Sequence, residues 1–270
     1  MAHSGAGACI PVLLYHAVMD DPPDWIAEFT VTPRQFAAQL DAIAASGRTP
    51  VTVGTLVDGL TGDGGVLPPR PVVLTFDDGF ADLPGPTAET LAGRGMPATA
   101  YLTTGAITPG GSSLLPPAPM MTLSRAPLLE HYGMEVGAHT LTHPQLDTLP
   151  PTALRRELDE PKAALEDVLG HEVGHLAYPH GYNSRAVRRA AAAAGYVSAA
   201  AVRHALSSQR DETYRIARLI VRRGHTALDV EAWMEGRGAP VAPFPDSLPT
   251  LGWRLYRRAR AAVKGPVFAG

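Results

Sequence analysis

The chain has 270 residues, of which 45% are hydrophobic and 18% are charged, and its formal net charge is −3. It is too long and too apolar for a disordered tail, and it can bury the core of one large domain or two small ones. The slightly acidic charge gives no overall attraction to nucleic acid, and we expect no nucleic-acid partner. The single cysteine, Cys9, excludes an intramolecular disulfide framework and a cysteine-rich zinc finger, so a metal ion would need histidine and carboxylate ligands.

The N-terminal residues give no sign of a targeting segment. Residues 1–8 lack the basic region that begins a secretory signal, and the apolar run over 10–15 is only six residues long. No stretch approaches the roughly 20 apolar residues of a membrane-spanning helix. We therefore expect a cytoplasmic protein without a transmembrane segment.

Short β-rich apolar runs alternate along the chain with longer segments of helical periodicity. The expected strands are 11–15, 72–76, 98–102, 134–138, 175–178 and 196–200. The expected helices are 33–45, 87–94, 124–132, 151–169 and 184–194. This alternation predicts an α/β protein with a parallel (β/α) barrel of about seven strands that is incomplete. In that architecture, catalytic groups lie at the C-terminal ends of the strands.

Two segments rich in proline and glycine interrupt this pattern. The first, 105–119, has no periodicity, and we expect it at the rim of the functional site. The second, 236–249, separates the body of the chain from a basic final segment. We therefore predict one domain over residues 1–236, followed in 237–270 by a linker and a basic C-terminal helix.

Two adjacent carboxylates, Asp77 and Asp78, stand between an apolar strand and Gly79. Successive residues of a strand face opposite ways, but the chain turns here, so both side chains could reach one cavity. An Asp-Asp-Gly turn without a functional role is an equally good interpretation of these residues alone.

His139 and His143 directly follow the strand expected over 134–138. Two imidazoles four residues apart share one face of a helical turn, which suits a zinc-like ion, although ten histidines in the chain allow a chance pair. Together with one of the two aspartates they form a three-ligand set that leaves a position open for water. The other aspartate is then available as a base on that water.

With these motifs the sequence resembles the polysaccharide deacetylase family of the NodB-homology type, also called carbohydrate esterase family 4. Three motifs carry the resemblance in the family's order: TFDDG at 75–79, HTLTH at 139–143 and AYPHG at 177–181. The opening PVLLYHAV at 11–18 is similar to that of the subgroup that includes the poly-N-acetylglucosamine deacetylases. The resemblance covers roughly residues 10–235. It implies a distorted (β/α) barrel and metal-dependent removal of an acetyl group from an amino sugar.

Carried over to this sequence, the resemblance implies that Asp77 is the general base and that Asp78, His139 and His143 bind the metal. We expect Zn²⁺, and the same ligands also accept Co²⁺, Ni²⁺ or Fe²⁺. In similar enzymes a backbone N–H of the third motif stabilises the oxyanion of the tetrahedral intermediate, and the matching donor here is the amide of His180.

The general acid that protonates the leaving nitrogen has more than one candidate. His16 ends the first strand and has this role in the subgroup that shares the Tyr-His opening, whereas His225 lies where many other members carry a late histidine. We favour His16, because His225 lacks the usual neighbouring leucine and can simply flank a helix beginning at Thr226. His180 is a third candidate, since the family commonly has an aromatic residue at that position.

The third motif also predicts substrate contacts at Tyr178 and Pro179. It departs from the family at Ala177, where many members carry an arginine that orients the base. Arg218 is expected to supply this charge or to contact substrate, although a surface position is equally consistent with an arginine-rich sequence.

We therefore predict a metal-dependent N-deacetylase that acts on an N-acetylated sugar within a saccharide, a glycolipid or a glycosylated metabolite. A carbohydrate O-acetyl esterase is the nearest alternative, because the same site serves both bonds, and a non-catalytic carbohydrate-binding barrel is a third interpretation. The basic segment 251–264 is compatible with peripheral membrane contact. A solvated helix packed on the barrel by Trp253 and Tyr256 is the favoured interpretation of that segment. Substrate size and oligomeric state do not follow from the sequence.

Overall fold

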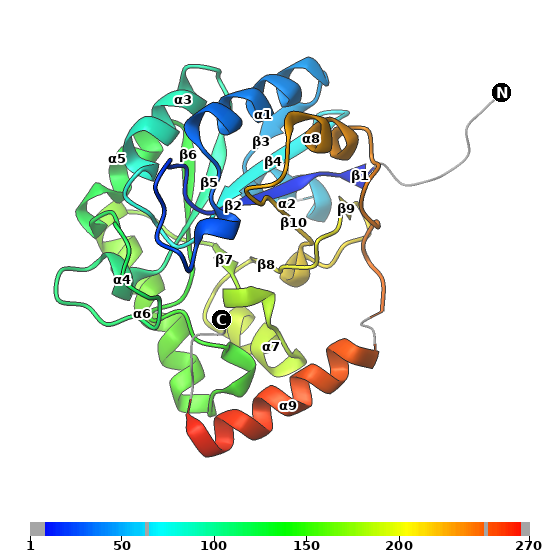
Figure 1. Ribbon diagram of the computed structural model, residues 1–270. Coiled ribbons are helices and arrows are strands. Elements are labelled where there is room, and N and C mark those ends of the chain that lie inside the picture. Colours follow the sequence, from blue (N-terminus) through cyan, green and yellow to red (C-terminus); the bar gives the residue numbers. More distant parts are fainter. Residues whose placement is uncertain (1–8, 63–64, 246–247, 266–270) are drawn as a thin grey trace.

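Figure 1 shows the computed structural model, which describes residues 9–62, 65–245 and 248–265. Residues 1–8, for which the sequence predicts no secretory signal, lie outside the described residues. A curved sheet forms the centre of the molecule, and its strands are, in spatial order, β10 (Leu219–Ile220), β2 (Val12–Tyr15), β4 (Pro71–Phe76), β5 (Ala98–Leu102), β6 (Met134–Ala138), β7 (His175–Ala177) and β8 (Ser198–Ala200). All neighbours along this path are parallel.

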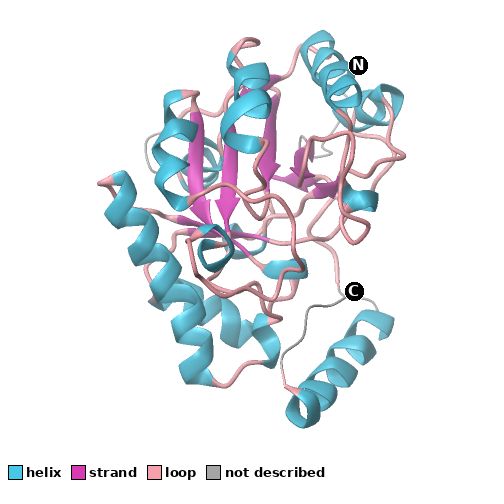
Figure 2. Ribbon diagram, turned by 60° about the vertical axis from the view of Figure 1, so that its left-hand side comes forward, coloured by secondary structure: helices cyan, strands magenta, loops and turns pink. Residues whose placement is uncertain are grey.

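Further elements surround this sheet. The short strand β3 (Thr49–Val51) pairs with β4, and β1 (Cys9–Ile10) pairs antiparallel with β9 (Ser207–Ser208) outside the main sheet. Helices flank the strands (Figure 2). They are α1 (Pro33–Ala45), α2 (Val53–Thr61), α3 (Ala88–Ala92), α4 (Thr104–Ile107), α5 (Ala126–His131), α6 (Pro151–Leu169), α7 (Arg185–Ala193), α8 (Ala227–Met234) and α9 (Leu248–Lys264).

The barrel is incomplete because its two end strands, β8 and β10, do not pair with each other. Instead, Ile216, which precedes β10, donates its N–H to the carbonyl of Ala199 and accepts from the N–H of Ala201, at 3.1 and 2.8 Å. Seven parallel strands thus curl into an open barrel, which confirms the predicted fold class.

Several elements agree with the prediction at both ends, namely those at 33–45, 98–102, 134–138 and 151–169. Strand β3 and helix α2 were not predicted from the sequence. Strand β3 has only three residues with a proline at its centre, and α2 contains two glycines, so neither segment has a clear pattern. The helix expected over 87–94 is shorter, because the chain enters α3 through the irregular turn Leu83–Thr87.

Complete burial of the central strands determines where the functional side chains lie. All residues of β2 and β4 are buried, as is typical of a parallel sheet covered on both faces. The carboxyl ends of these strands lie at one edge of the barrel, and so do those of β6 and β7. His16, Asp77, His139 and Tyr178 are the first residues beyond these four strands, so they gather at that edge.

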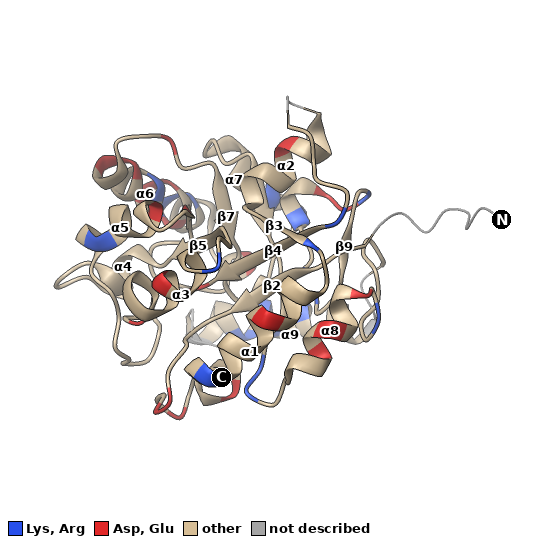
Figure 3. Ribbon diagram, turned by 90° about the horizontal axis from the view of Figure 1, so that it is seen from above, with Lys and Arg blue, Asp and Glu red and all other residues tan. Residues whose placement is uncertain are grey.

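Charged residues are distributed widely over the molecule. In the ribbon of Figure 3, acidic and basic residues occur on several helices and loops and do not gather in one part of the view. Within the described chain, no helix combines the length and the apolar character that spanning a bilayer requires.

The C-terminal helix α9 lies at the margin of the barrel (Figure 1). Its expected packing through Trp253 is confirmed, because Trp253 Nε1 donates to the hydroxyl of Tyr182 at 3.0 Å, whereas Tyr256 is 56% exposed. Arg257 is more deeply buried than either, with 2% exposure. Residues 246–247 and 266–270 of the predicted C-terminal region lie outside the described residues, and the division at residue 236 stays a prediction.

Candidate active site

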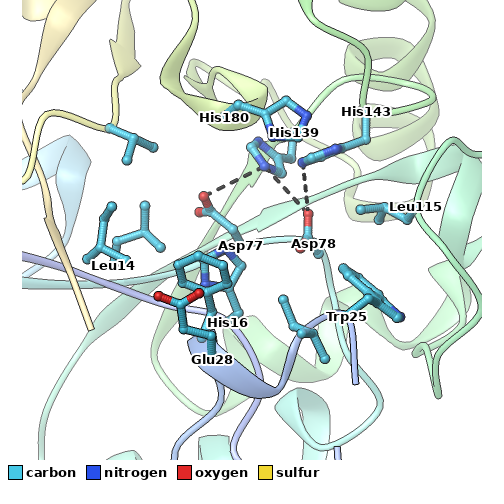
Figure 4. Close-up of a pocket in the computed structure, with 14 residues that line it drawn as sticks. Leu14, His16, Trp25, Glu28, Asp77, Asp78, Leu115, His139, His143 and His180 are labelled. Atoms are coloured by element: carbon cyan, nitrogen blue, oxygen red, sulfur yellow. Dashed lines mark ion pairs between the residues drawn. The ribbon is translucent and has the colours of Figure 1, made fainter. Parts of the chain in front are cut away.

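A pocket of about 450 Å³ opens at the carboxyl edge of the sheet. Its polar lining consists of His16, Glu28, Asp77, Asp78, His139, His143 and His180. Its apolar lining consists of Leu14, Trp25, Ile26, Phe29, Leu115, Val202 and Ile220. Figure 4 shows the imidazoles of His139 and His143 facing the two carboxylates, with His180 beside them. Leu115 belongs to the segment 105–119, which therefore reaches the rim of the pocket as expected.

The turn after β4 brings both aspartates into this pocket. Asp77 N–H donates to the carbonyl of Tyr15 at 3.0 Å, which extends the pairing of β4 with β2. The chain then turns sharply, because Asp78 and Gly79 adopt left-handed φ angles of 74° and 90°. A left-handed aspartate is uncommon and costs free energy, which is typical of a functional position. The alternation of a strand ends here, so the two neighbouring side chains share one cavity.

The segment that carries His139 and His143 is a loop, and the expected helical turn is wrong. Thr140 and His143 have left-handed φ angles of 69° and 63°, which a right-handed helix excludes. The loop folds back on itself, since His143 N–H donates to Thr140 Oγ1 at 3.0 Å. The two imidazoles still converge, with ring centroids 4.9 Å apart.

Glu157 of α6 holds this loop in place, and sequence analysis missed it. Its Oε2 accepts the backbone N–H groups of Leu141 and Thr142 at 3.0 and 2.8 Å, and its Oε1 accepts the Thr142 hydroxyl at 2.6 Å. The available signal was the helical spacing, because Glu157 occupies the buried face of α6 beside Leu154 and Leu158. A glutamate on an apolar helix face needs polar partners.

Asp78, His139 and His143 form a three-ligand cluster whose donor atoms all lie within 4.8 Å of one another. Asp78 Oδ1 lies 3.3 Å from His143 Nε2 and 3.5 Å from His139 Nε2. His139 Nδ1 donates to the carbonyl of Ala177 at 2.8 Å, so Nε2 is the unprotonated nitrogen and faces the cluster. Within the described chain, Asp78 Oδ1 has no hydrogen-bond partner. These residues fit a divalent cation with open positions for water.

Burial shifts the pKa values of the cluster residues in opposite directions. Burial, together with the adjacent Asp77 carboxylate, raises the pKa of Asp78 well above its ordinary value. Burial and the neighbouring imidazoles of His139 and His180 lower the pKa of His143 well below its ordinary value. A metal ion binds neutral imidazoles and deprotonated carboxylates, so a bound cation would offset the burial and the Asp77 charge that raise the pKa of Asp78.

Asp77 is held by a buried arginine. Arg218 donates from Nη1 and Nη2 to the two carboxylate oxygens of Asp77 at 2.7 and 2.8 Å, and from Nη1 also to Thr75 Oγ1 at 3.1 Å. Burial alone would raise the pKa of Asp77, but the Arg218 guanidinium outweighs this effect and holds that pKa below its ordinary value. Arg218 is fully buried, so its expected substrate contact is corrected to a positioning role. It supplies the charge that Ala177 cannot.

His16 lies in the pocket on the side of the two carboxylates. Its ring packs against Phe29 with centroids 5.5 Å apart, and its Nδ1 is buried without a hydrogen-bond partner among the described residues. Burial lowers the pKa of His16 to about 4, although the Asp77 carboxylate opposes this shift.

His225 is not brought to this pocket. Its ring packs against Trp233 with centroids 4.9 Å apart, and its Nδ1 accepts the N–H of Arg222 at 3.1 Å. The carbonyl of His225 accepts the side-chain amide of Gln39 at 2.9 Å. The expectation that His225 serves as an alternative acid is therefore corrected, because its ring is occupied in a packing contact elsewhere.

The third motif contributes one side chain to the pocket. The His180 ring packs edge-on against His143 with centroids 4.7 Å apart, and the His180 backbone has a left-handed φ of 57°. The next residue, Gly181, must remain glycine, because a Cβ atom there would lie 2.3 Å from the backbone nitrogen of Val202. Burial lowers the pKa of His180 to about 4.

Tyr178 and Pro179 precede His180 in this motif, and both are buried and do not line the pocket. The Tyr178 hydroxyl donates to the carbonyl of Tyr214 at 3.1 Å. Their expected substrate contact is therefore corrected, since both residues instead support the backbone that carries His180.

A second depression, here called the side groove, adjoins the pocket. It has a volume of about 310 Å³ and shares His180 and Val202 with the pocket. Its remaining lining includes Trp253 and Arg254, so α9 forms part of its wall.

Residues 64–199 match the sequence model of the family described as polysaccharide deacetylase. The chain belongs to the polysaccharide deacetylase family. Membership makes the protein a hydrolase of the carbohydrate deacetylase type. The matched residues include Asp77 and the three residues of the cluster. His16 and Arg218 lie outside the matched range.

Similar proteins agree with this assignment. YxkH of Bacillus subtilis (strain 168) is 23% identical over 232 residues, which are 84% of this chain and 77% of YxkH. Among solved structures, the Streptococcus pyogenes deacetylase PplD in complex with acetate has a TM-score of 0.72 at 22% identity, covering 83% of this chain and 97% of PplD. IcaB from Ammonifex degensii has a TM-score of 0.61 at 22% identity, covering 92% of this chain and 97% of IcaB. At these identities, the likeness to the solved structures shows only that this chain shares their fold.

Proposed function

We propose that the protein removes the acetyl group from the nitrogen of an N-acetylated amino sugar and that it needs a divalent metal ion. The observation that carries this proposal is the meeting of Asp78, His139 and His143 with Asp77 in one pocket. Three ligands and one separate base are the parts that metal-assisted hydrolysis requires.

Asp78, His139 and His143 would hold the ion, and Zn²⁺ is the metal that best suits one carboxylate and two imidazoles. When bound, a divalent cation lowers the pKa of a water molecule and polarises the carbonyl of the substrate. The hydrogen bond from His139 Nδ1 to Ala177 fixes the ring that faces the ion.

Asp77 takes the proton of the attacking water. Its position beside His139 supports this role, with Asp77 Oδ2 3.6 Å from His139 Nε2. Arg218 keeps the carboxylate ionised and fixes its orientation, so that one of its oxygens faces the cluster. The backbone amide of His180 is the proposed donor to the oxyanion that forms on the acetyl carbonyl.

His16 delivers a proton to the leaving nitrogen as the C–N bond breaks. With a pKa of about 4, the imidazole is neutral at rest, and once protonated it is a strong acid. The nearby Asp77 carboxylate favours its protonated form. As the C–N bond breaks, the oxygen of water and one of its protons become part of acetic acid, and the other proton passes by way of Asp77 and His16 to the sugar nitrogen, which leaves as the free amine.

The shape of the pocket supports a saccharide larger than a single sugar. The pocket has about 450 Å³ and an apolar wall that includes Trp25 and Phe29, and the side groove continues beyond His180. Aromatic rings bind the apolar faces of sugars, whereas the polar floor receives the acetamide. A saccharide, a glycolipid headgroup or a glycosylated metabolite fits this description. The cytoplasmic location stays a prediction that cell fractionation can test.

Release of free amine tests the function. The full-length protein is stripped of metal, reconstituted with Zn²⁺, Co²⁺ or Ni²⁺, and assayed on N-acetylated mono- and oligosaccharides beside O-acetylated xylan. We expect amine release that depends on added metal and that is lost in the double variant His139→Ala/His143→Ala. The exposed variant Asp41→Asn is the matched control and should retain activity.

Three results would contradict the proposal. Acetate release from O-acetylated xylan without amine release from any N-acetylated sugar would make the protein an O-acetyl esterase. Amine release that is unchanged after metal removal would exclude the metal. Saccharide binding without release of either product would make the protein a non-catalytic carbohydrate-binding barrel.

A further inference from the structure

Helix α9 carries a charged residue on its buried face and apolar residues on its exposed face. It is attached to the barrel through Arg257, whose guanidinium donates to both carboxylate oxygens of Asp147 at 2.8 and 2.9 Å. The same guanidinium lies over the ring of Tyr182, 3.4 Å from its centroid. The innermost residue of the helix is therefore charged.

The outward face of α9 is apolar. Leu255 is 69% exposed and Val263 is 83% exposed, and Tyr256 and Ala259 are exposed between them. Residues spaced by three, four and seven positions share one face of a helix, so these side chains form a continuous row opposite Arg257. A helix that only covers a soluble barrel turns its apolar side inward. This row is directed to the solvent instead, which is typical of a surface that contacts something else.

Basic side chains border this apolar row. Arg258 and Arg260 are exposed on its two flanks, and the sequence of α9 from Leu248 to Lys264 contains no aspartate or glutamate. An apolar row flanked by arginines matches the boundary of an anionic bilayer, where acyl chains lie below negatively charged headgroups. Tyr256 stacks on Trp253 with centroids 5.3 Å apart, while Trp253 Nε1 donates to the hydroxyl of Tyr182 in the barrel at 3.0 Å. Tyr256 is thus held in the exposed row, and tyrosine rings favour the headgroup region.

We propose that α9 binds peripherally to the surface of an anionic lipid bilayer, with Leu255, Tyr256 and Val263 inserted and with Arg258 and Arg260 on the headgroups. The helix lies in the plane of the membrane and does not cross it. Arg257 and its contact with Asp147 keep the helix attached to the barrel during binding.

Membrane binding would also keep the active site near the bilayer. Trp253 and Arg254 of α9 line the side groove, and that groove shares His180 with the pocket. Binding would thus keep the pocket near substrates held at the membrane, such as a sugar attached to a lipid. This consequence rests on the proposed function, whereas the binding of α9 does not.

Vesicle sedimentation tests the binding without any assay of activity. The full chain is mixed with vesicles of phosphatidylcholine alone or of phosphatidylcholine with phosphatidylglycerol. We expect binding that requires phosphatidylglycerol and weakens with salt. The variant Arg258→Gln/Arg260→Gln should bind about thirtyfold more weakly, because each arginine near an anionic surface contributes a factor of about five. The variant Leu255→Ser/Val263→Ser should lose most of its binding to the same vesicles.

Matched controls test whether binding depends on α9 itself or on any exposed leucine or arginine. Leu228→Ser changes a leucine of α8 that is 72% exposed, and Arg156→Gln/Arg237→Gln removes two exposed arginines outside α9. Both controls should bind like the unchanged protein. Equal binding by the Leu255→Ser/Val263→Ser variant, or no binding to phosphatidylglycerol, would overturn the proposal. A dimer in size-exclusion chromatography that this double variant dissociates would instead make the row an interface between copies of the chain.

Discussion

Arg218 and Asp77 form a buried, doubly hydrogen-bonded ion pair beneath the pocket, with nitrogen to oxygen distances of 2.7 and 2.8 Å. The two residues are 141 positions apart in the chain, and their elements lie on either side of β2 in the sheet. The pair therefore connects the late edge of the barrel to the strand that carries the base. It stabilises the fold and also sets the charge of Asp77.

Removal of Arg218 should destabilise the protein strongly. Arg218→Met leaves the Asp77 carboxylate buried without its partner, and such a change costs about 3–5 kcal/mol of the free energy of unfolding. The matched control is Arg94→Met, which breaks the exposed pair between Arg94 and Asp41 and should cost at most about 1 kcal/mol. Urea unfolding of the two variants measures the difference. Equal losses would show that the buried pair has no special role.

Exchange of Arg218 for lysine should change the pH dependence of activity. Arg218→Lys keeps the positive charge but loses the paired hydrogen bonds, so the pKa of Asp77 should rise toward the value that burial favours. A base works only when it is deprotonated, and a higher pKa moves the acid side of the kcat/KM profile to higher pH. The profile of the variant, measured on an N-acetylated sugar, checks this. An unshifted acid side would place the base elsewhere.

Asp77→Asn should separate metal binding from catalysis. Asp77 is not one of the three proposed ligands, so the variant should bind metal at the level of the unchanged protein. Loss of a general base lowers the rate by at least about a hundredfold. Metal analysis and kcat, measured on the same preparation, test both parts. A variant with normal metal content and a normal rate would exclude Asp77 as the base.

Glu157 should affect the metal although it is not a ligand. Glu157→Gln keeps the size of the side chain but weakens the hydrogen bonds to Leu141 and Thr142 that shape the loop between the two histidines. Loss of an outer partner of a metal site typically lowers affinity by about 10–100-fold. Glu160→Gln, an exposed change on the same helix, is the control. Competition with a chelator gives both affinities, and equal values would contradict the positioning role.

The barrel and the cluster of Asp78, His139 and His143 could be predicted from the sequence because their signals are local. A buried strand that ends in Asp77, Asp78 and Gly79 can be recognised from adjacent residues, and so can two histidines four positions apart. The helical turn from which the histidine pair was predicted is wrong, but the pair still converges. Either a helix or a tight loop brings residues 139 and 143 to one side of the chain.

The partners of these residues are harder to predict, because they come from distant segments. Arg218 was predicted to orient the base only through the resemblance to the family, with substrate contact and a surface position left open, because the curvature of the barrel and no local pattern brings it to Asp77. The role of Glu157 could not be predicted, because its partners include backbone N–H groups, which have no sequence signal. The role of Arg257 in α9 follows from Asp147 and Tyr182, which the sequence places far away.

The final prediction concerns the group that protonates the leaving nitrogen. His16 lies in the pocket, so His16→Ala should strongly reduce hydrolysis of an N-acetylated sugar, whose amine leaves poorly without a proton. The same variant should lose far less activity on an aryl acetate ester, because a phenoxide leaves readily without protonation. The ratio of kcat/KM for amide and ester measures this difference, and the metal, Asp77 and the oxyanion donor serve both substrates equally.

His225→Ala is the internal control for this comparison, since His225 packs against Trp233 outside the pocket. It should lower both activities to the same small extent, through stability alone. Metal content must be equal in the unchanged protein and in both variants, so that the ratio reports the leaving group only. A selective loss on the amide for His225→Ala, or an equal loss on amide and ester for His16→Ala, would transfer the acid role away from His16. It would also weaken the likeness to the subgroup that shares the Tyr15-His16 opening.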